Sequence, residues 1–175
     1  QDRSDELQER DVVRLLLEIG RKEMESAVPV AAYVLNEIRD VSINHMHLRL
    51  MIHEIESQME AGNIPDHHYF LQHHDDELKR LAMEIISSPY VLSENWNKMH
   101  DIYIKMPSDN FISDVKSSIA RFKMKKIMNM ISENLKELNS AKGNAEEEIY
   151  FMNVHQRLSQ WKQELGKDIG TVIVN

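Results

Sequence analysis

The sequence predicts an all-α protein, in which an N-terminal helical bundle is joined by a long helix to a C-terminal antiparallel helical hairpin. Glycine and proline number only five and four in 175 residues, so few positions break a helix. Apolar residues recur at spacings of three and four, which places them on one face of a helix. Residues 108–142 contain neither glycine nor proline, and a helix of that length spans about 50 Å at 1.5 Å per residue.

Three helices are predicted in the first 61 residues. The first begins at Asp5, whose side chain and that of Gln8 have the spacing of a capping box. The second covers residues 26–40, with Pro29 in its first turn, where the missing N–H costs little. The third covers residues 44–61. Its predicted buried face consists of Met46, Leu48, Leu50, Met51, Ile52, Ile55 and Met59.

Three further helices are expected before the long one: around Tyr69, over residues 75–87, and over residues 92–103, the last containing Trp96. Pro89 ends the second of these, because the residue before a proline is pushed out of the helical region. The apolar stripe of the long helix rotates between its two halves. We therefore expect this helix to serve two different packing partners.

The hairpin is predicted from the residues that follow the long helix. Gly143 and Asn144 end that helix, and Asn144 with Glu147 provides a cap followed by a carboxylate three residues on. The apolar, β-branched tail at residues 171–175 is interpreted as an added strand or a docking segment. The last helix carries an apolar stripe at spacings of four, four, three and four, formed by Tyr150, Val154, Leu158, Trp161 and Leu165.

Two subdomains are predicted, a bundle over residues 1–122 and a hairpin over residues 123–175, with the long helix shared between them.

The net charge of −8 disfavours a general nucleic-acid binder, which needs a positive surface. Residues 1–106 carry 20 acidic and 11 basic side chains, whereas residues 107–175 carry 9 and 10. The single basic cluster is interpreted as a solvent-exposed segment of the long helix. The alternatives are that it contacts nucleic acid, an acidic partner protein or the acidic first half of the chain. It consists of Arg121, Lys123, Lys125 and Lys126.

Several classes of chemistry lack the residues that they need. The chain has no cysteine, which excludes disulfides, thiolate metal sites and thiol nucleophiles. It has no glycine-rich phosphate loop, no Gly-x-Ser-x-Gly motif, and no apolar run that suits a membrane span or a secretory signal. Its acidic clusters fall at predicted helix starts, where they favour the helix dipole. We therefore predict neither catalytic residues nor a cofactor, and interpret the chain as an interaction module.

Histidines are numerous, at nine, and four of them surround the predicted short helix: His67, His68, His73 and His74. They lack the His-Glu-x-x-His and Glu-x-x-His spacings of helical zinc and di-iron sites. Adjacent histidines also point to different helix faces. Surface histidines are the favoured interpretation, and a histidine-rich helical metal-binding protein is the alternative.

Aromatic and methionine side chains gather in the predicted hairpin. Tyr150, Phe151 and Met152 are consecutive, so they point about 100° apart around a helix. Together with Trp161, they exceed what a two-helix hairpin can hide on one face. Such side chains are enriched at protein interfaces, which favours a partner-binding surface. The alternatives are that the hairpin folds back onto the bundle and buries them, or that the chain is a structural bundle that associates with itself.

Several strings along the chain have the order and spacing of one known family. They are Glu9-Arg10-Asp11-Val12-Val13-Arg14-Leu15-Leu16-Leu17, Val30-Ala31-Ala32-Tyr33-Val34-Leu35-Asn36-Glu37-Ile38, Asn63-Ile64-Pro65-Asp66, Tyr69-Phe70-Leu71, Ser87-Ser88-Pro89-Tyr90 with Trp96, and His155-Gln156-Arg157-Leu158 to Lys162-Gln163-Glu164-Leu165. Over nearly its whole length, the chain resembles the C-terminal helicase-binding domain of bacterial DnaG-type DNA primases.

The resemblance implies a bundle and a terminal hairpin joined by a long helix. The hairpin would supply most of the contact with the N-terminal region of the DnaB-type replicative helicase, and the bundle would modulate the helicase. Zinc-binding and polymerase domains precede this domain in such primases, and the start at Gln1 is interpreted as the cut end of a larger protein. The domain itself is expected to be non-catalytic, to reach DNA only through the parent primase, and to act at the replication fork in the bacterial cytoplasm without a membrane.

The resemblance assigns contact residues only by their positions on the two hairpin helices. We expect the helicase-binding surface to include Tyr150, Phe151, Leu158 and Trp161, with Ile127 and Ile131 holding the facing helix. The apolar tail that ends at Asn175 lies beyond the pattern of the family.

Overall fold

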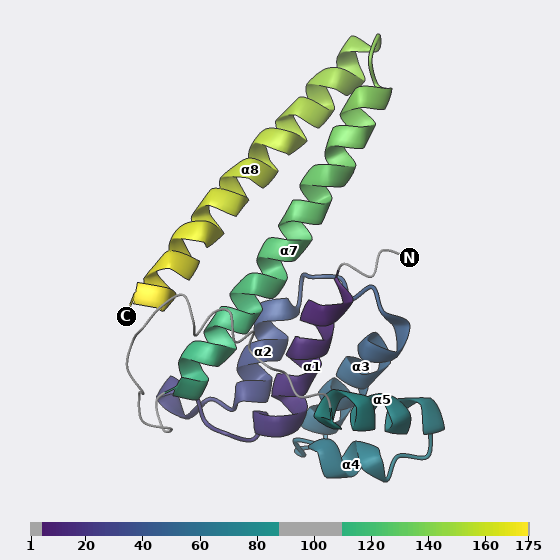
Figure 1. The fold of residues 1–175 in the computed structure, drawn as a ribbon, viewed down its shortest axis with the longest axis vertical. Coiled ribbons are helices and arrows are strands. Elements are labelled where there is room, and N and C mark those ends of the chain that lie inside the picture. The colour runs from purple at the N-terminus through teal and green to yellow at the C-terminus, as the bar shows by residue number, and fades with distance from the viewer. Residues whose placement is uncertain (1–4, 88–109, 175) are drawn as a thin grey trace.

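The computed structural model describes residues 5–87 and 110–174, and these residues form an all-α fold, as predicted (Figure 1). Within them there is no β-strand beyond a single bridge between Glu23 and Pro29. The helix predicted over residues 92–103, with Trp96, lies outside the described residues. None of the described helices is both long and apolar enough to cross a lipid bilayer. Residues Glu25–Ala27 form a single 3-10 turn. The α-helices are α1 (Glu6–Ile19), α2 (Val30–Ile38), α3 (Met46–Glu60), α4 (His67–Leu71), α5 (Asp76–Ser87), α7 (Asn110–Ser140) and α8 (Ala145–Val174).

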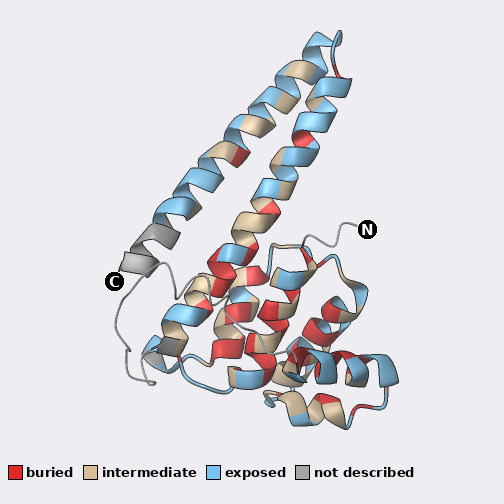
Figure 2. Cartoon of the chain, viewed as in Figure 1, coloured by how far each residue is buried: buried red, intermediate tan, exposed pale blue. Residues whose placement is uncertain are grey.

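Helices α1 to α5 pack into a bundle, and the first half of α7 lies against α1 and α2 (Figure 1). The second half of α7 leaves the bundle and projects away from it, with α8 antiparallel at its side. Buried residues are concentrated in the bundle, whereas most of the hairpin surface is exposed (Figure 2). The largest fully buried apolar side chains of the core are Phe70, Phe122, Leu15, Leu16, Leu17, Leu48, Met51 and Ile55. The expectation that one long helix serves two packing partners is therefore confirmed.

The start of α1 differs from the predicted capping box. Asp5 is the N-cap residue, but its side chain makes no capping hydrogen bond. Its carboxylate instead accepts hydrogen bonds from Lys126 at 3.0 Å and from the side chain of Asn44 at 3.0 Å. The prediction was wrong because a charged partner 121 residues away in the sequence binds the carboxylate more strongly than the local N–H groups do.

Helix α2 is shorter than the predicted helix over residues 26–40. Pro29 is its N-cap residue and Val28 is extended, as expected for a residue that precedes a proline. The chain before it folds back on itself, with the Met24 N–H donating to the Val28 carbonyl at 2.7 Å and the Val30 N–H donating to the Lys22 carbonyl at 2.8 Å. These bonds use backbone groups that a longer helix would have needed.

Two residues of the predicted buried face of α3 are exposed. Met46 and Leu50 lie on the solvent side, whereas the buried residues are Leu48, Met51, Ile52 and Ile55. At 100° per residue, the buried four cluster on one face, and Met46 and Leu50 fall on the opposite one. The prediction failed because an apolar residue at the wrong helical phase cannot reach α1 and α5, the helices against which α3 packs.

The tail of the chain is helical, so its interpretation as an added strand was wrong. The alternative interpretation, a docking segment, stays a prediction. Helix α8 continues through Gly166 and Gly170 to Val174. Because α7 is 31 residues long and α8 is 30, the two helices can run beside each other over nearly their full lengths (Figure 1). The strand interpretation failed because β-propensity is a weak preference, and a helix that is already formed gains one hydrogen bond with each residue that extends it.

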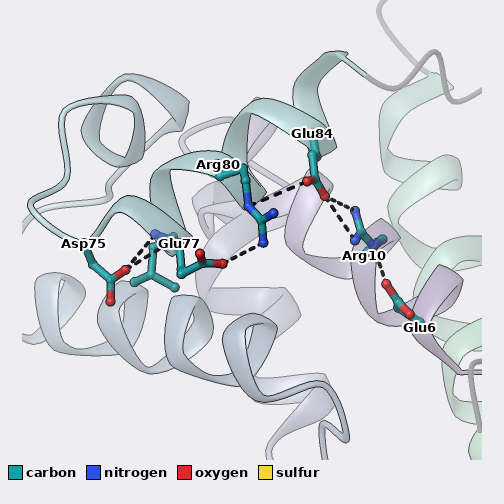
Figure 3. A network of polar contacts seen from close by, with 7 residues as sticks. Glu6, Arg10, Asp75, Glu77, Arg80 and Glu84 are labelled. Carbon is teal, nitrogen blue, oxygen red and sulfur yellow. Dashed lines mark hydrogen bonds and ion pairs between the residues drawn. The ribbon is translucent and has the colours of Figure 1, made fainter. Parts of the chain in front are cut away.

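Charged side chains near the surface link α5 to α1 (Figure 3). Arg10 lies 2.9 Å from the carboxylate of Glu6 and 3.4 Å from that of Glu84, and Arg80 lies 2.6 Å from that of Glu77. Asp75 caps α5 by accepting hydrogen bonds from the N–H groups of the second and third residues after it. The contact between α1 and α5 is the one from Arg10 to Glu84, whereas the other two pairs lie within a single helix. Ion pairs near the surface each contribute little free energy.

A buried polar cluster joins α1, α7 and the segment between α2 and α3. The ammonium of Lys126 lies 2.6 Å from Glu9 and 3.0 Å from Asp5, and the three side chains are 10%, 1% and 4% exposed. Glu9 also accepts the backbone N–H groups of Asn44 at 2.7 Å and His45 at 2.9 Å. We call Lys126, Asp5, Glu9, Asn44 and Asn129, which also donates to Asp5, the Lys126 cluster.

Replacing Lys126 by alanine is expected to lower the free energy of unfolding by about 3 to 5 kcal/mol, because two carboxylates would stay buried without a counter-charge. Chemical denaturation followed by circular dichroism measures the change. The matched control is Lys136→Ala, an exposed lysine of the same helix, which should change the stability by no more than about 0.5 kcal/mol. Equal effects of the two substitutions would show that the cluster contributes no net stability.

Candidate protein-interaction surface

The turn between α7 and α8 determines how the hairpin closes. Gly143 adopts a φ of +100°, a left-handed conformation that suits glycine because it has no Cβ. The side chain of Asn144 accepts the Glu147 N–H at 3.5 Å, so its predicted role as a cap is confirmed. In a capping box, a carboxylate near the start of the helix accepts a backbone N–H from the residues before it. Glu148 does this here, accepting the Gly143 N–H at 2.9 Å, whereas Glu147 was expected to do so.

The seam between the two helices consists of side chains at spacings of three and four. On α7, Ile127, Ile131, Asn134, Leu138 and Ala141 share one face, and this face contacts α8 because the Asn134 side chain donates to the Phe151 carbonyl at 3.0 Å. On α8, Leu158 is the central seam residue and is only 3% exposed. Partly buried residues of α8 on either side of Leu158 include Phe151, Val154, His155, Ser159 and Leu165. Four predicted site residues, Ile127, Ile131, Phe151 and Leu158, are therefore buried or half-buried within the hairpin.

Tyr150 and Trp161 lie outside the seam. They are 63% and 51% exposed, although the predicted stripe placed them in line with Leu158. At 100° per residue, both residues are rotated by about 60° to 80° from Leu158, and in the same direction. They are eleven residues apart, about three turns, so they lie on one face of α8. The hairpin does not fold back onto the bundle to bury them.

A groove of about 670 Å³ lies beside Trp161, where α7 leaves the bundle. Four parts of the chain line it: Asp5 before α1, residues 40–44 after α2, residues 123–136 of α7, and residues 161–165 of α8. Its apolar lining consists of Val41, Ile127, Met130, Trp161 and Leu165. We call this hollow the Trp161 groove. A second hollow, of about 520 Å³, lies beside Tyr150 near the tip of the hairpin. The two exposed aromatic residues therefore each border a hollow.

The hairpin also exposes apolar residues that were not predicted as site residues. Met128 and Leu135 are exposed on α7, and they lie two turns apart on one face. Ile149 and Met152 are exposed on α8. The rotation of the apolar stripe along α7 is a signal in the sequence that could have indicated Met128 and Leu135. Their positions around the helix face neither the bundle nor the centre of the seam.

The basic cluster is largely used inside the molecule. Lys123 lies 2.5 Å from the carboxylate of Glu37, and Lys126 belongs to the buried cluster described above. Arg121 donates to the hydroxyls of Ser117 and Ser118, at 3.1 and 3.0 Å. The interpretation that the acidic half of the chain pairs with these cations is confirmed for Lys123 and Lys126.

The histidines of the α4 region have structural contacts. The Nδ1 of buried His73 accepts the Asp75 N–H at 3.1 Å, which supports the start of α5. Within residues 5–87 and 110–174, no three histidine, aspartate or glutamate side chains are placed to hold a metal ion. Next to His73, the hydroxyl of Tyr69 donates to the carboxylate of Glu54. This hydrogen bond raises the pKa of Tyr69 to about 12 and lowers the pKa of Glu54.

The Tyr69–Glu54 hydrogen bond is expected to make stability depend on pH at both extremes. Because the folded-state pKa of Tyr69 is raised, its contribution is present below its ordinary value of 10.0 and is lost as the pH rises toward about 12. The pKa of Glu54 is lowered, so its contribution is lost as the pH falls below its ordinary value of 4.5. Tyr69→Phe should therefore flatten both limbs in urea unfolding measured across pH. Tyr150→Phe, at an exposed tyrosine, should keep the wild-type profile, and an unchanged Tyr69→Phe profile would contradict the assignment.

Core and surface roles within α8 can be separated by substitution. Leu158→Ala removes the central seam residue and should cost about 2 to 5 kcal/mol of stability. Tyr150→Ala removes an exposed ring and should cost no more than about 1 kcal/mol. Thermal unfolding of the two variants measures the difference, and similar losses would show that Tyr150 packs in the hairpin core.

Comparison with known proteins identifies a family for this chain. Neither the curated proteins nor the solved structures include a match to this chain. One family profile matches it over residues 1–172, nearly its full length, and that family is described as a domain of unknown function, DUF8430. The chain, with its helical bundle and projecting hairpin, therefore belongs to the DUF8430 family.

Proposed function

We propose that this chain is the non-catalytic C-terminal domain of a bacterial DnaG-type primase, which binds the N-terminal region of the DnaB-type replicative helicase. The proposal combines the sequence resemblance with one structural observation. Tyr150 and Trp161 are exposed on the same face of a hairpin that projects from the bundle. The binding would couple primer synthesis to the replication fork in the cytoplasm.

The exposed aromatic pair favours a protein partner on energetic grounds. A tryptophan and a tyrosine present large apolar areas to water, and covering them is favourable. Both residue types are enriched among the side chains that dominate binding free energy at interfaces. Leu158 and the rest of the seam hold the hairpin together without these two rings, so the rings are available to a partner at little cost in stability.

The division of labour in this proposal follows from the placement of the charges. Lys123 and Lys126 are paired within the molecule, which leaves little of the basic cluster for phosphate contacts. DNA would accordingly be reached only through the other domains of the parent primase. The bundle would act as the rigid base of the hairpin, because its core and the Lys126 cluster fix the position of α7.

A second candidate function is self-association through the hairpin. It is favoured by the exposed apolar residues Met128, Leu135 and Met152, which lie outside the face that carries Tyr150 and Trp161. Size-exclusion chromatography with light scattering distinguishes the two candidates. A stable dimer that excludes the helicase would favour this candidate, and a monomer that binds the helicase would favour the first.

The proposed function is tested by mixing the purified chain with the N-terminal region of the replicative helicase from the same organism. A complex is expected at micromolar concentrations. Trp161→Ala should weaken it by about 2 kcal/mol or more, roughly thirtyfold, while leaving thermal stability nearly unchanged. Met83→Ala, which removes an exposed residue of α5 in the bundle, is the matched control and should bind normally. No complex with the wild-type chain would refute the proposal.

A further inference from the structure

The charges around the Trp161 groove are unbalanced. Of the lysines that line it, Lys123 is paired with Glu37, and Lys126 is paired with Asp5 and Glu9. Three further carboxylates line the groove and are exposed, those of Asp40, Glu133 and Glu164. None of these three forms an ion pair with another described residue.

Only one cation of the groove lining is available to balance these carboxylates. Lys136 is exposed and has no ion-pair partner among the described residues. Three carboxylates against one ammonium give the groove a net negative charge at neutral pH. An acidic peptide or a nucleic-acid strand would therefore be repelled.

Because the groove also has an apolar lining, a ligand that fits it must present an apolar surface as well as a positive charge. Ile127, Met130 and Leu165 are aliphatic or thioether surfaces that an aliphatic side chain would cover. The half-exposed indole of Trp161 offers an aromatic face, on which a guanidinium stacks more favourably than an ammonium does. A guanidinium can also bind a carboxylate through two hydrogen bonds at once. Arginine therefore fits the combination of indole and carboxylates better than lysine.

From this combination we infer that the Trp161 groove binds a protein segment that presents an arginine next to an aliphatic residue. The inference rests on the proposed function, because the helicase N-terminal region would supply the segment. The aliphatic side chain packs on Ile127, Met130 and Leu165, and the arginine lies between Trp161 and the carboxylates of Glu133 and Glu164. The groove thus provides specificity in addition to the contact area of the aromatic face.

The first experiment tests the groove without the helicase. Two synthetic helical peptides are compared, one with leucine and arginine four residues apart and one with glutamate in place of the arginine. Fluorescence anisotropy should show saturable binding of the leucine–arginine peptide only. The emission of the wild-type chain should shift to shorter wavelength on binding, and the shift should disappear in Trp161→Phe. Equal binding of both peptides, or binding of neither, would overturn the inference.

Charge reversal locates the binding site. The double variant Glu133→Lys with Glu164→Lys should weaken binding of the leucine–arginine peptide at least about tenfold, because two attractions become repulsions. The matched control is Glu56→Lys with Glu60→Lys, which makes the same charge change at exposed positions of α3. The control should bind as the wild-type chain does. Equal weakening in both double variants would show a general effect of net charge and would overturn the inference.

The second experiment uses the helicase N-terminal region and separates this inference from the proposed function. Weaker helicase binding by the Glu133→Lys, Glu164→Lys variant, with the control unaffected, supports both. Helicase binding that the double variant leaves unchanged overturns the groove inference and leaves the proposed function intact. If the leucine–arginine peptide binds and the helicase does not, the proposed function fails while the chemistry assigned to the groove stands.

Discussion

The buried ammonium of Lys126 is the polar constraint on which the arrangement of α1 and α7 depends. An unpaired charge at this depth is very unfavourable, so the fold is stable only where Asp5 and Glu9 both reach the ammonium. Glu9 also accepts two backbone N–H groups from the segment before α3. A single group of side chains therefore fixes α1, α7 and the α2–α3 connection relative to one another, near the point where α7 leaves the bundle.

The position of the hairpin follows from this constraint. Because α7 is one continuous helix, fixing it at Lys126 also sets the direction in which its second half projects (Figure 1). The seam around Leu158 then places α8 along that half, and the phase of the seam turns Tyr150 and Trp161 outward. Lys126 itself lines the Trp161 groove, so the same residue that anchors α7 forms part of the proposed binding surface.

The surface of the hairpin combines two features that would serve the proposed recruitment of a protein partner. Its aromatic residues offer apolar area on a stable support, and its carboxylates offer selectivity by charge. Two cations of the basic cluster are paired with acidic residues of the bundle, Lys123 with Glu37 and Lys126 with Asp5 and Glu9, and so are not free to bind phosphate. In this way the acidic half of the chain is partly neutralised by the helix that connects it to the hairpin.

The sequence by itself determined the helical class, the long helix, the break at Gly143 and the cap at Asn144, because these depend on local periodicity and backbone conformation. It could not determine which apolar residues of a helix are covered. Leu158, Tyr150 and Trp161 belong to the same apolar stripe in the sequence, but only Leu158 is buried. It also could not reveal that Asp5 pairs with Lys126 instead of capping α1. Only the tertiary structure decided these features, because each depends on which distant segment packs against the residue, and contacts between distant segments leave no periodic signal in the sequence.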